Sequence, residues 1–300
     1  MFSSFKAPIS WARYAVYADR SIIVLNKPPG LICQGSLTNG QKPRDSDKFN
    51  DLLHDLKDHF KLDNLPYAVH RLDKSTTGAL VLAKNIAAAR QLAQQFQSRT
   101  VGKTYLALVR GGEKSFPAKL GEIKDAIEIN GDGRVSIGES CDAEFAATGW
   151  ELVASSRKVP LSLLRLTLHT GLKHQLRVHL AQSLHTPILG DALYSRKPIS
   201  EKITQVIRVP EHRVFLHASR LTLSRFKKVG PNKHVRLGIA AALPADFVAI
   251  CNDVGIQLDA TDVSGGLFVD DEPLGGHDIE DLQGKWLRPR RPARLANERT

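Results

Sequence analysis

The stretch that decides the fold is Ala68-Val69-His70-Arg71-Leu72-Asp73-Lys74-Ser75-Thr76-Thr77-Gly78, which runs directly into the apolar segment 79–83. A short apolar run bounded by turn-forming residues is typical of a buried strand. The polar residues before it therefore form a loop at the edge of a core. This loop presents one carboxylate, Asp73, between the cations Arg71 and Lys74. Because Asp, Ser, Thr and Gly all favour turns, a purely structural role for Asp73 is the alternative.

Hydrophobic periodicity and turn signals outside this stretch predict a sheet with few helices. Strands that follow one another in runs favour an antiparallel arrangement over alternating βαβ units. We therefore predict an α+β fold, with a predominantly antiparallel mixed sheet flanked by helices. The expected helices are 49–60, 86–98, 171–184 and 245–251, and the expected strands are 15–18, 21–25, 79–83, 103–110, 143–153, 161–169 and 214–223, with a hairpin over 124–138.

The domain organisation follows from where periodicity begins and ends. Residues 1–13 are expected to be a short N-terminal extension, and 14–255 one catalytic domain. Six acids and no Lys or Arg fall within 270–281, and six bases with one acid follow within 285–300. Such charge blocks without periodicity predict a flexible tail over 256–300.

The charge of the chain indicates a polyanionic partner. The formal net charge is +11, and eleven Lys or Arg stand against two acids between Arg196 and Arg236. Nucleic-acid backbones are the usual partners of such a surface, although a merely basic, soluble surface is the alternative. The hydrophobic content of 42% is that of a globular protein, and no apolar stretch approaches the length of a membrane helix, so no membrane association is expected.

The cysteines and the N-terminal residues indicate in which cellular compartment the protein is expected. Cys33, Cys141 and Cys251 are far apart in sequence, which suits neither a disulfide framework nor a metal knuckle and favours a reducing compartment. Residues 1–18 contain two bases, three serines and no acid, a composition that favours mitochondrial import. A cytoplasmic or nuclear location is the alternative.

The predicted helix 171–184 begins against the usual charge preference. Its first turn carries Lys173, His174 and Arg177 and no acid. Cations are disfavoured at the positive end of a helix dipole, so an anion is expected nearby, either a buried carboxylate or an RNA phosphate. The alternative is a poorly optimised surface helix.

Metal and serine-hydrolase chemistry are not indicated. His169, His174 and His179 recur every five residues, a spacing that spreads them around a helix instead of along one face. There is no H-E-x-x-H pattern, cysteine cluster or G-x-S-x-G elbow. We expect no metal and no cofactor, which leaves a carboxylate and an arginine, with a tyrosine as a third candidate.

Four segments in order resemble the motifs of the RluA-type pseudouridine synthases. They are 24–31 (Val-Leu-Asn-Lys-Pro-Pro-Gly-Leu), 70–78, 103–105 (Lys-Thr-Tyr), and 171–180 (Gly-Leu-Lys-His-Gln-Leu-Arg-Val-His-Leu) with its continuation 187–191 (Pro-Ile-Leu-Gly-Asp). Leu172 and Lys173 stand where the family usually has Arg-Thr, and the Lys-His-Gln version resembles the branch with mitochondrial rRNA-modifying members.

The resemblance implies a pseudouridine synthase-like catalytic domain that isomerises specific uridines in structured RNA. Ribosomal RNA is the first expectation and tRNA the second, with no obligate protein partner. Two alternatives stay open. One is a non-catalytic RNA-binding relative, and the other is an RNA-cleaving enzyme that uses His70 or His174 as general base.

The resemblance also implies roles for single residues. Asp73 is the catalytic aspartate, which attacks the sugar C1′ or the uracil ring or acts through a glycal, so that the base detaches, rotates and rejoins through carbon. Arg177 pairs with Asp73, which explains the cationic start of the helix. Tyr105 stacks on the flipped uracil and could take part in proton transfer; without the motif it would be an ordinary strand tyrosine. The substrate-binding set is Arg71, which fills the gap left by the flipped nucleotide, Leu176, which lines the base pocket, and His70, Lys103 and His174.

Overall fold

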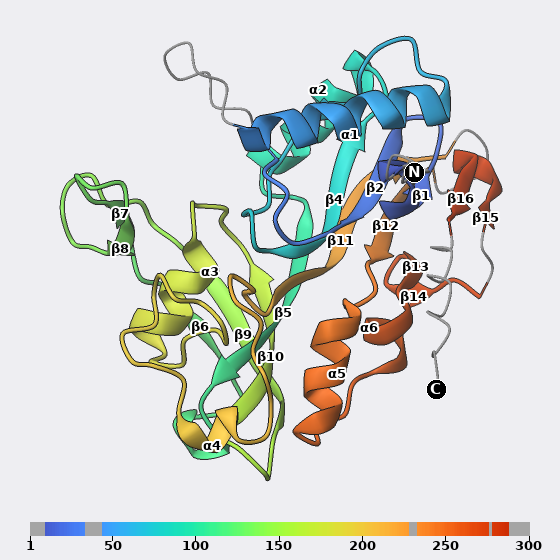
Figure 1. The fold of residues 1–300 in the computed structure, drawn as a ribbon. Coiled ribbons are helices and arrows are strands. Elements are labelled where there is room, and N and C mark those ends of the chain that lie inside the picture. Colours follow the sequence, from blue (N-terminus) through green and yellow to red (C-terminus); the bar gives the residue numbers. More distant parts are fainter. Residues whose placement is uncertain (1–9, 34–43, 228–232, 276–277, 288–300) are drawn as a thin grey trace, which may run out of the picture.

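One large sheet runs through the molecule, and helices lie against both of its faces (Figure 1). The computed structural model describes residues 10–33, 44–227, 233–275 and 278–287. Its strands are β1 (Ala15–Ala18), β2 (Ile22–Lys27), β3 (Tyr67–Ala68), β4 (Thr77–Ala83), β5 (Gly102–Arg110), β6 (Leu120–Ile123), β7 (Ile127–Ile129), β8 (Val135–Ile137), β9 (Thr148–Ser155), β10 (Leu161–Leu168), β11 (Leu216–Phe226), β12 (His234–Ala240), β13 (Gly266–Val269), β14 (Glu272–Pro273), β15 (Asp278–Ile279) and β16 (Gly284–Trp286).

The helices are few and mostly short. They are α1 (Arg44–Phe60), α2 (Ile86–Gln97), α3 (Gln175–Val178), α4 (Glu201–Thr204), α5 (Ala245–Asp253) and α6 (Ala260–Ser264), with the 3-10 turns η1 (Trp11–Tyr14), η2 (Glu113–Ser115) and η4 (Glu280–Leu282) and the π-helical turn η3 (His179–Ser183).

The sheet is antiparallel at every pairing of its described strands except one. Its main path is β15-β16-β1-β2-β4-β11-β5-β10-β9-β6, and β12, β13 and β14 continue from β11. The exception is β4 with β11, which pair in parallel at Thr77 with His217 and at Gly78 with Ala218. The predicted α+β fold with a predominantly antiparallel mixed sheet is confirmed.

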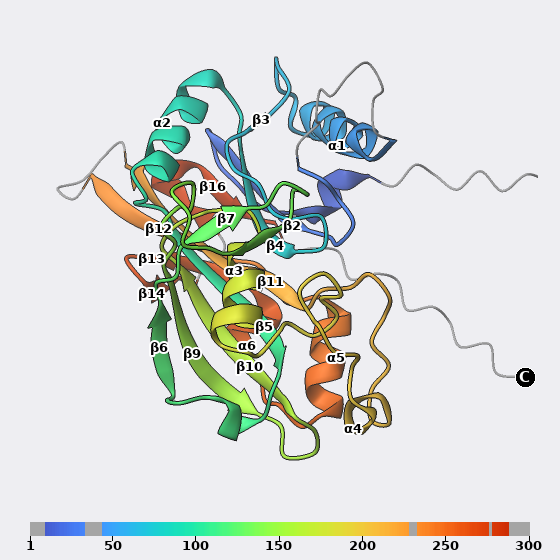
Figure 2. The ribbon, with the colours of Figure 1, turned by 90° about the vertical axis from the view of Figure 1, so that its left-hand side faces the viewer.

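Two hydrophobic clusters cover the two faces of this sheet at the α1–α2 end. Because side chains alternate along a strand, Leu25 of β2 lies in the cluster that contains Leu52 of α1, whereas Val24 lies in the cluster that contains Leu92 of α2. Figure 2 shows α1 and α2 on opposite sides of β2 and β4. All seven residues of β4 are buried, as expected for a strand covered on both faces.

The predicted elements overlap the observed ones, but several bounds differ. α1 begins five residues before the expected helix 49–60, and β9 begins five residues after the start of the expected strand 143–153. The strand β12 was not expected. The helix expected over 171–184 begins only at Gln175 and continues as the π-helical turn η3. The flexible tail expected from residue 256 is wrong for the described residues 256–275 and 278–287. There, β13 pairs with β12 and β16 pairs with β1. These strands are only two to four residues long and complete existing sheet edges, so they leave no periodic signal of their own.

Some expectations fall on residues beyond the described ranges. Of the predicted extension 1–13, residues 1–9 lie outside them, and η1 begins at Trp11. Residues 288–300 of the predicted tail lie outside them as well.

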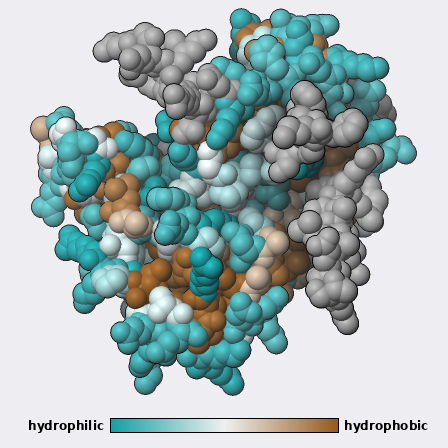
Figure 3. Space-filling model, viewed as in Figure 1, coloured by the Kyte–Doolittle hydropathy of each residue, from teal (hydrophilic) through white to brown (hydrophobic). Residues whose placement is uncertain are grey.

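The surface is mainly polar, with some apolar area. Figure 3 shows that apolar surface gathers in the lower half of the face seen in Figure 1. Among the described residues, none of the helices combines the length and the apolar composition that a bilayer crossing requires. All three cysteines are free thiols: Cys33 and Cys251 are buried and Cys141 is exposed.

Candidate functional site

All eight predicted site residues line a single cavity of about 540 Å³, formed by the loop before β4, strand β5 and the start of α3. Its volume is in the range of small-ligand sites. Asp73 is the one carboxylate among the residues that line it. Five cations surround that carboxylate, namely Arg71, Arg99, Lys103, Lys173 and Arg177. The cavity therefore suits an anionic ligand.

The loop that carries Asp73 is fixed through its backbone by the segment that follows β2. The ammonium of the fully buried Lys27 donates to the carbonyl oxygens of Pro28, Leu31 and Lys74, at 3.0, 3.0 and 3.1 Å. The amide of Gly30 donates to the same Lys74 carbonyl at 2.8 Å. Burial lowers the pKa of Lys27 to about 8. The segment 27–30 thus fixes the backbone carbonyl of Lys74, the residue next to Asp73.

Gly78 fixes where the loop ends. It has a φ of +110°, and a Cβ at this position would overlap the carbonyl oxygen of Ala218. Only glycine lets β4 approach β11 this closely, because every other residue carries that Cβ. The close approach positions the Asp73 loop against the centre of the sheet.

Arg177 is bound mainly by Asp191, a residue to which the sequence assigned no role. Its Nε and Nη2 donate to the two carboxylate oxygens of Asp191 at 2.7 and 2.8 Å. Both side chains are buried, with 8% and 1% exposed. The remaining nitrogen, Nη1, lies 3.7 Å from Oδ2 of Asp73. That distance is an electrostatic contact and exceeds a hydrogen bond. Arg177 therefore faces Asp73, but its stronger partner is Asp191.

Gly190 determines the position of Asp191. Its φ is +79°, and a Cβ there would overlap the carbonyl oxygen of Arg213. The carboxylate of Asp191 also accepts the backbone N–H of Leu193 at 3.1 Å. A buried carboxylate needs such partners, and together they fix the guanidinium between Asp191 and Asp73.

His174 is held by Tyr194, a second residue that the sequence did not single out. It caps α3 in a left-handed conformation with φ +56°, which histidine tolerates better than most residues. Its Nδ1 lies 2.7 Å from the hydroxyl of Tyr194, and its Nε2 lies 3.9 Å from Oδ2 of Asp73. Burial lowers the pKa of His174, which favours a neutral imidazole at pH 7.

Tyr105, Leu176 and Lys103 form the apolar and cationic wall of the cavity. Tyr105 is 8% and Leu176 5% exposed. Burial, followed by the charge of Asp73, raises the pKa of Tyr105, so its phenol stays protonated at neutral pH. The ammonium of Lys103 donates to the carbonyl of Thr170 at 3.0 Å, and burial lowers its pKa to about 8.

His70 and Arg71 differ in exposure although they are neighbours. Nε2 of His70 accepts the backbone N–H of Val81 at 2.9 Å, and its ring stacks on Phe96 with centroids 4.6 Å apart. Burial lowers the pKa of His70 to about 3. Its basic nitrogen is therefore already used within the fold, which disfavours a general-base role. Arg71 is exposed at the mouth of the cavity.

The functional residues that the sequence missed are Lys27, Asp191 and Tyr194. Lys27 and Asp191 stand inside quoted motifs, so the available signal was a charged residue within a segment that should be buried. Tyr194 lies three residues after Asp191 and carried no such signal. Among the described residues, no group of three or more His, Cys, Asp or Glu is positioned to bind a metal ion.

Comparisons with known proteins agree with this geometry. A family model described as RNA pseudouridylate synthase matches residues 21–182. A curated relative, the ribosomal large subunit pseudouridine synthase D of Borreliella burgdorferi, is 34% identical over 226 residues, which is 73% of this chain and 66% of the relative. The tRNA pseudouridine synthase C of Pasteurella multocida is 33% identical over 245 residues, covering 79% of this chain and 94% of the relative.

A solved structure supports the fold as well. The human RNA pseudouridylate synthase domain containing 4 protein matches with a TM-score of 0.65 and 27% identity, covering 83% of this chain and 95% of the other. The chain spans about two thirds of the length of the Borreliella relative. The matched segment 21–182 contains Asp73, Tyr105 and Arg177. On the family match and these relatives, the chain belongs to the RNA pseudouridylate synthase family.

Proposed function

We propose that this protein is an RNA pseudouridine synthase, an isomerase that converts specific uridines to pseudouridine through Asp73 without a cofactor. The observation that carries the proposal is the position of Asp73. It is the one carboxylate lining a cationic cavity, it is 20% exposed there, and Arg177 faces it at 3.7 Å. A partly exposed carboxylate oxygen in an anion-binding cavity is suited to attack a bound nucleotide.

The proposed reaction needs nothing beyond the bound uridine and the side chains of the cavity. The bond between N1 and C1′ breaks, a bond between C5 and C1′ forms, C5 loses its proton and N1 gains one. Atoms and charge balance within the nucleotide. Asp73 supplies the negative oxygen that stabilises or captures the sugar or the ring. Arg177, anchored on Asp191, keeps that oxygen aimed while the base rotates.

The remaining cavity residues bind the nucleotide in this proposal. Extruding a base from a helix costs a few kcal/mol, and stacking on an aromatic ring such as Tyr105 recovers about 1–3 kcal/mol. Leu176 provides apolar contact beside Tyr105. Arg71 is exposed at the mouth, where it can occupy the gap that the extruded base leaves. His174 and Lys103 add hydrogen-bond donors toward the phosphate or the base.

The RNA class is supported by the relatives. One of them is named for the large ribosomal subunit and another for tRNA. We propose ribosomal RNA as the first substrate class and tRNA as the second.

Mapping pseudouridine across all RNA of cells with and without this protein tests the proposal. We expect at least one uridine to lose its modification when the protein is absent, and to regain it when the wild-type chain is restored. RNA length must not change, because isomerisation leaves the backbone intact. Shortened RNA would identify a nuclease, and RNA binding with no change in any uridine would identify a non-catalytic relative. Either result would overturn the proposal.

A further inference from the structure

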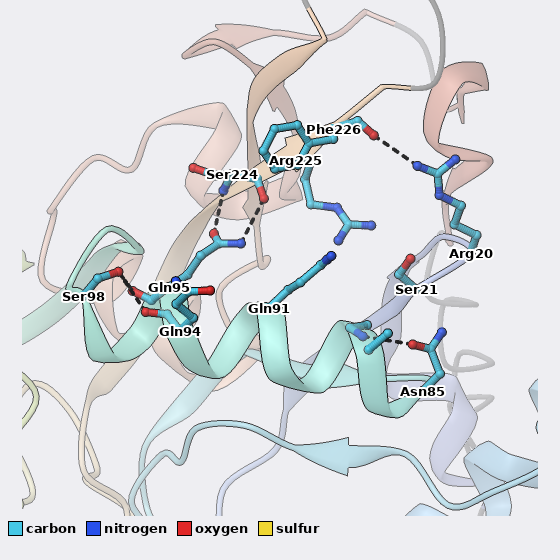
Figure 4. Close-up of a pocket in the computed structure, with 12 residues that line it drawn as sticks. Arg20, Ser21, Asn85, Gln91, Gln94, Gln95, Ser98, Ser224, Arg225 and Phe226 are labelled. Atoms are coloured by element: carbon cyan, nitrogen blue, oxygen red, sulfur yellow. Dashed lines mark hydrogen bonds between the residues drawn. The ribbon is translucent and has the colours of Figure 1, made fainter.

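A second cavity, of about 580 Å³, lies along the outer side of α2 (Figure 4). We call it the α2 groove. Its walls are α2, the turn before β2 and the end of β11. Its lining is polar and contains amides, hydroxyls and two guanidinium groups but no carboxylate; the polar members are Arg20, Ser21, Asn85, Gln91, Gln94, Gln95, Ser98, Ser224 and Arg225.

The groove exists because two central strands separate. β4 and β11 pair only at Thr77 and Gly78, and β5 stops pairing with β11 at Thr222. Beyond that point the edge of β11 that β5 had paired with has no neighbouring strand among the described residues. The amide of Gln95 takes the place of a strand there: it donates to the Ser224 carbonyl at 3.1 Å and accepts the Ser224 N–H at 2.9 Å. The opening between the strands remains accessible beside α2.

Each of the two guanidinium groups of the groove has one nitrogen without a hydrogen-bond partner among the described residues. Arg225 is 7% exposed and binds Asp19 through Nη2 at 2.7 Å, but its Nε has no partner among the described residues. Arg20 donates through Nη2 to the carbonyl of Phe226 at 3.0 Å, and its Nη1 is unpartnered within the described part of the chain. Residues 84–99, which comprise α2 and its flanking residues, contain three Lys or Arg and no acid. This end of the molecule is therefore complementary to an anion.

The groove and the catalytic cavity lie on adjoining sides of the C-terminal end of α2. Ser98 lines the groove, whereas its neighbour Arg99 lines the cavity that contains Asp73. Likewise Gln95 faces the groove and Phe96 faces the cavity. The twelve residues of α2 make a wall about 18 Å long, which is enough for several nucleotides of an extended strand. Phe226, 61% exposed at the far end, offers a ring for base stacking.

We propose that the α2 groove binds an RNA segment that flanks the target uridine. This inference rests on the proposed function. Side-chain amides such as Gln91 and Gln94 hydrogen-bond phosphates and base edges equally well, and the guanidinium groups supply the positive charge. The flanking strand leaves the catalytic cavity at Arg99 and runs along α2. The groove adds affinity and selects for context without contacting the reacting base.

The test introduces negative charge in the groove with Gln91→Glu and Gln94→Glu together. Both side chains are exposed, so the fold is not at risk. Gln97→Glu is the control for a single added charge and is compared with Gln91→Glu alone as well as with the double variant, because Gln97 is an exposed glutamine of the same helix that lines neither cavity. Phe226→Ala is a second variant with no change in charge. The RNA probes are a transcript with native flanks around a uridine that the wild-type protein modifies, and a short stem-loop that contains only that uridine and its helix.

The double variant is expected to bind the flanked transcript about tenfold more weakly, because like charges facing each other across an interface are costly. The short stem-loop should be bound and isomerised as by the wild type, and Gln97→Glu should change neither RNA. Equal affinity of wild type and double variant for the flanked transcript would overturn the inference, and so would an equal loss on both RNAs. Failure of the wild type to isomerise any uridine would instead overturn the proposed function.

Discussion

At the scale of single residues, Arg177 contacts two carboxylates, those of Asp191 and Asp73, at different distances. Asp191 takes two of its nitrogens in close hydrogen bonds, and Asp73 receives only the longer contact from Nη1. The guanidinium is therefore immobilised by a carboxylate that does not line the cavity containing Asp73. Asp73 is left oriented but without a short bond from that arginine, so its oxygens remain available to a substrate.

Removing Asp191 should destabilise the protein. Asp191→Ala leaves the guanidinium of Arg177 buried without its main partner, which costs roughly 3–5 kcal/mol of unfolding free energy. Urea unfolding measures this. The double variant Asp191→Ala, Arg177→Met should recover part of the loss, because the unpaired charge is gone. An unchanged unfolding free energy in Asp191→Ala would show that the pair contributes little, contrary to its burial.

Lys103 should make RNA affinity depend on pH. Burial lowers its pKa to about 8, so its ammonium is mostly charged at neutral pH and loses its proton as the pH rises through about 8. We expect RNA affinity, measured by fluorescence anisotropy, to fall across that interval. Lys103→Arg keeps its charge and should remove the step while binding at neutral pH persists. The same alkaline step in Lys103→Arg would assign the titration to another group.

At the scale of elements, the sequence predicted most strands and helices within a few residues. The reason is that β4, β5 and α2 are long, buried on at least one face and bounded by turn residues. The start of the helix around Gln175 was misjudged, because His174 caps it in a left-handed conformation that the apolar spacing does not reveal. The roles of Lys27 and Asp191 were also missed, because their decisive contacts, with the Lys74 carbonyl and with Arg177, join separate motifs of the sequence.

The contact between β4 and β11 should be sensitive to one methyl group. Gly78→Ala puts a Cβ onto the carbonyl of Ala218 and forces a positive φ on a residue that resists it. Overpacking of this kind costs about 1–3 kcal/mol, and strain at the backbone adds to it. Thermal unfolding measures the loss. Gly131→Ala, where an added Cβ meets nothing within 4 Å, is the control and should melt near the wild-type temperature.

The segment 260–286 shows where composition misleads. Its acids predicted a loose tail, yet Ile279 and Leu282 are buried against the α2 side of the sheet, and β16 completes the edge at β1. Two-residue and three-residue strands gain their order from the edge they join.

The expected mitochondrial location rests on the composition of residues 1–18, half of which lie outside the described residues, and stays a prediction.

At the scale of the whole molecule, buried histidines should make the fold sensitive to acid. His217 is fully buried, with Nδ1 2.9 Å from the Thr77 hydroxyl and Nε2 3.0 Å from the carbonyl of Ala241. Burial lowers its pKa from 6.5 to about 4. Between pH 6.5 and about pH 4, the imidazole of His217 is protonated in the unfolded chain but neutral in the folded protein. The stabilisation is therefore complete above pH 6.5 and is lost as the pH falls toward 4, by roughly 3 kcal/mol at most.

Unfolding free energies measured by urea titration between pH 7 and 4.5 test this expectation. His217→Gln is the comparison, because glutamine is neutral throughout and can still hydrogen-bond. It should be less stable at neutral pH but lose stability less steeply in acid. Equal slopes for the two proteins would mean that His217 does not titrate on unfolding in this interval.

The proposed isomerisation of uridine depends on the carboxylate of Asp73. The direct measurement is tritium release from RNA labelled at C5 of uridine, because that hydrogen leaves when C5 becomes the glycosidic carbon. Asp73→Asn keeps the shape of the side chain and removes its charge. We predict that the wild type releases tritium from its target RNA, while Asp73→Asn binds the same RNA and releases none. Tritium release by Asp73→Asn at the wild-type rate would contradict the claim.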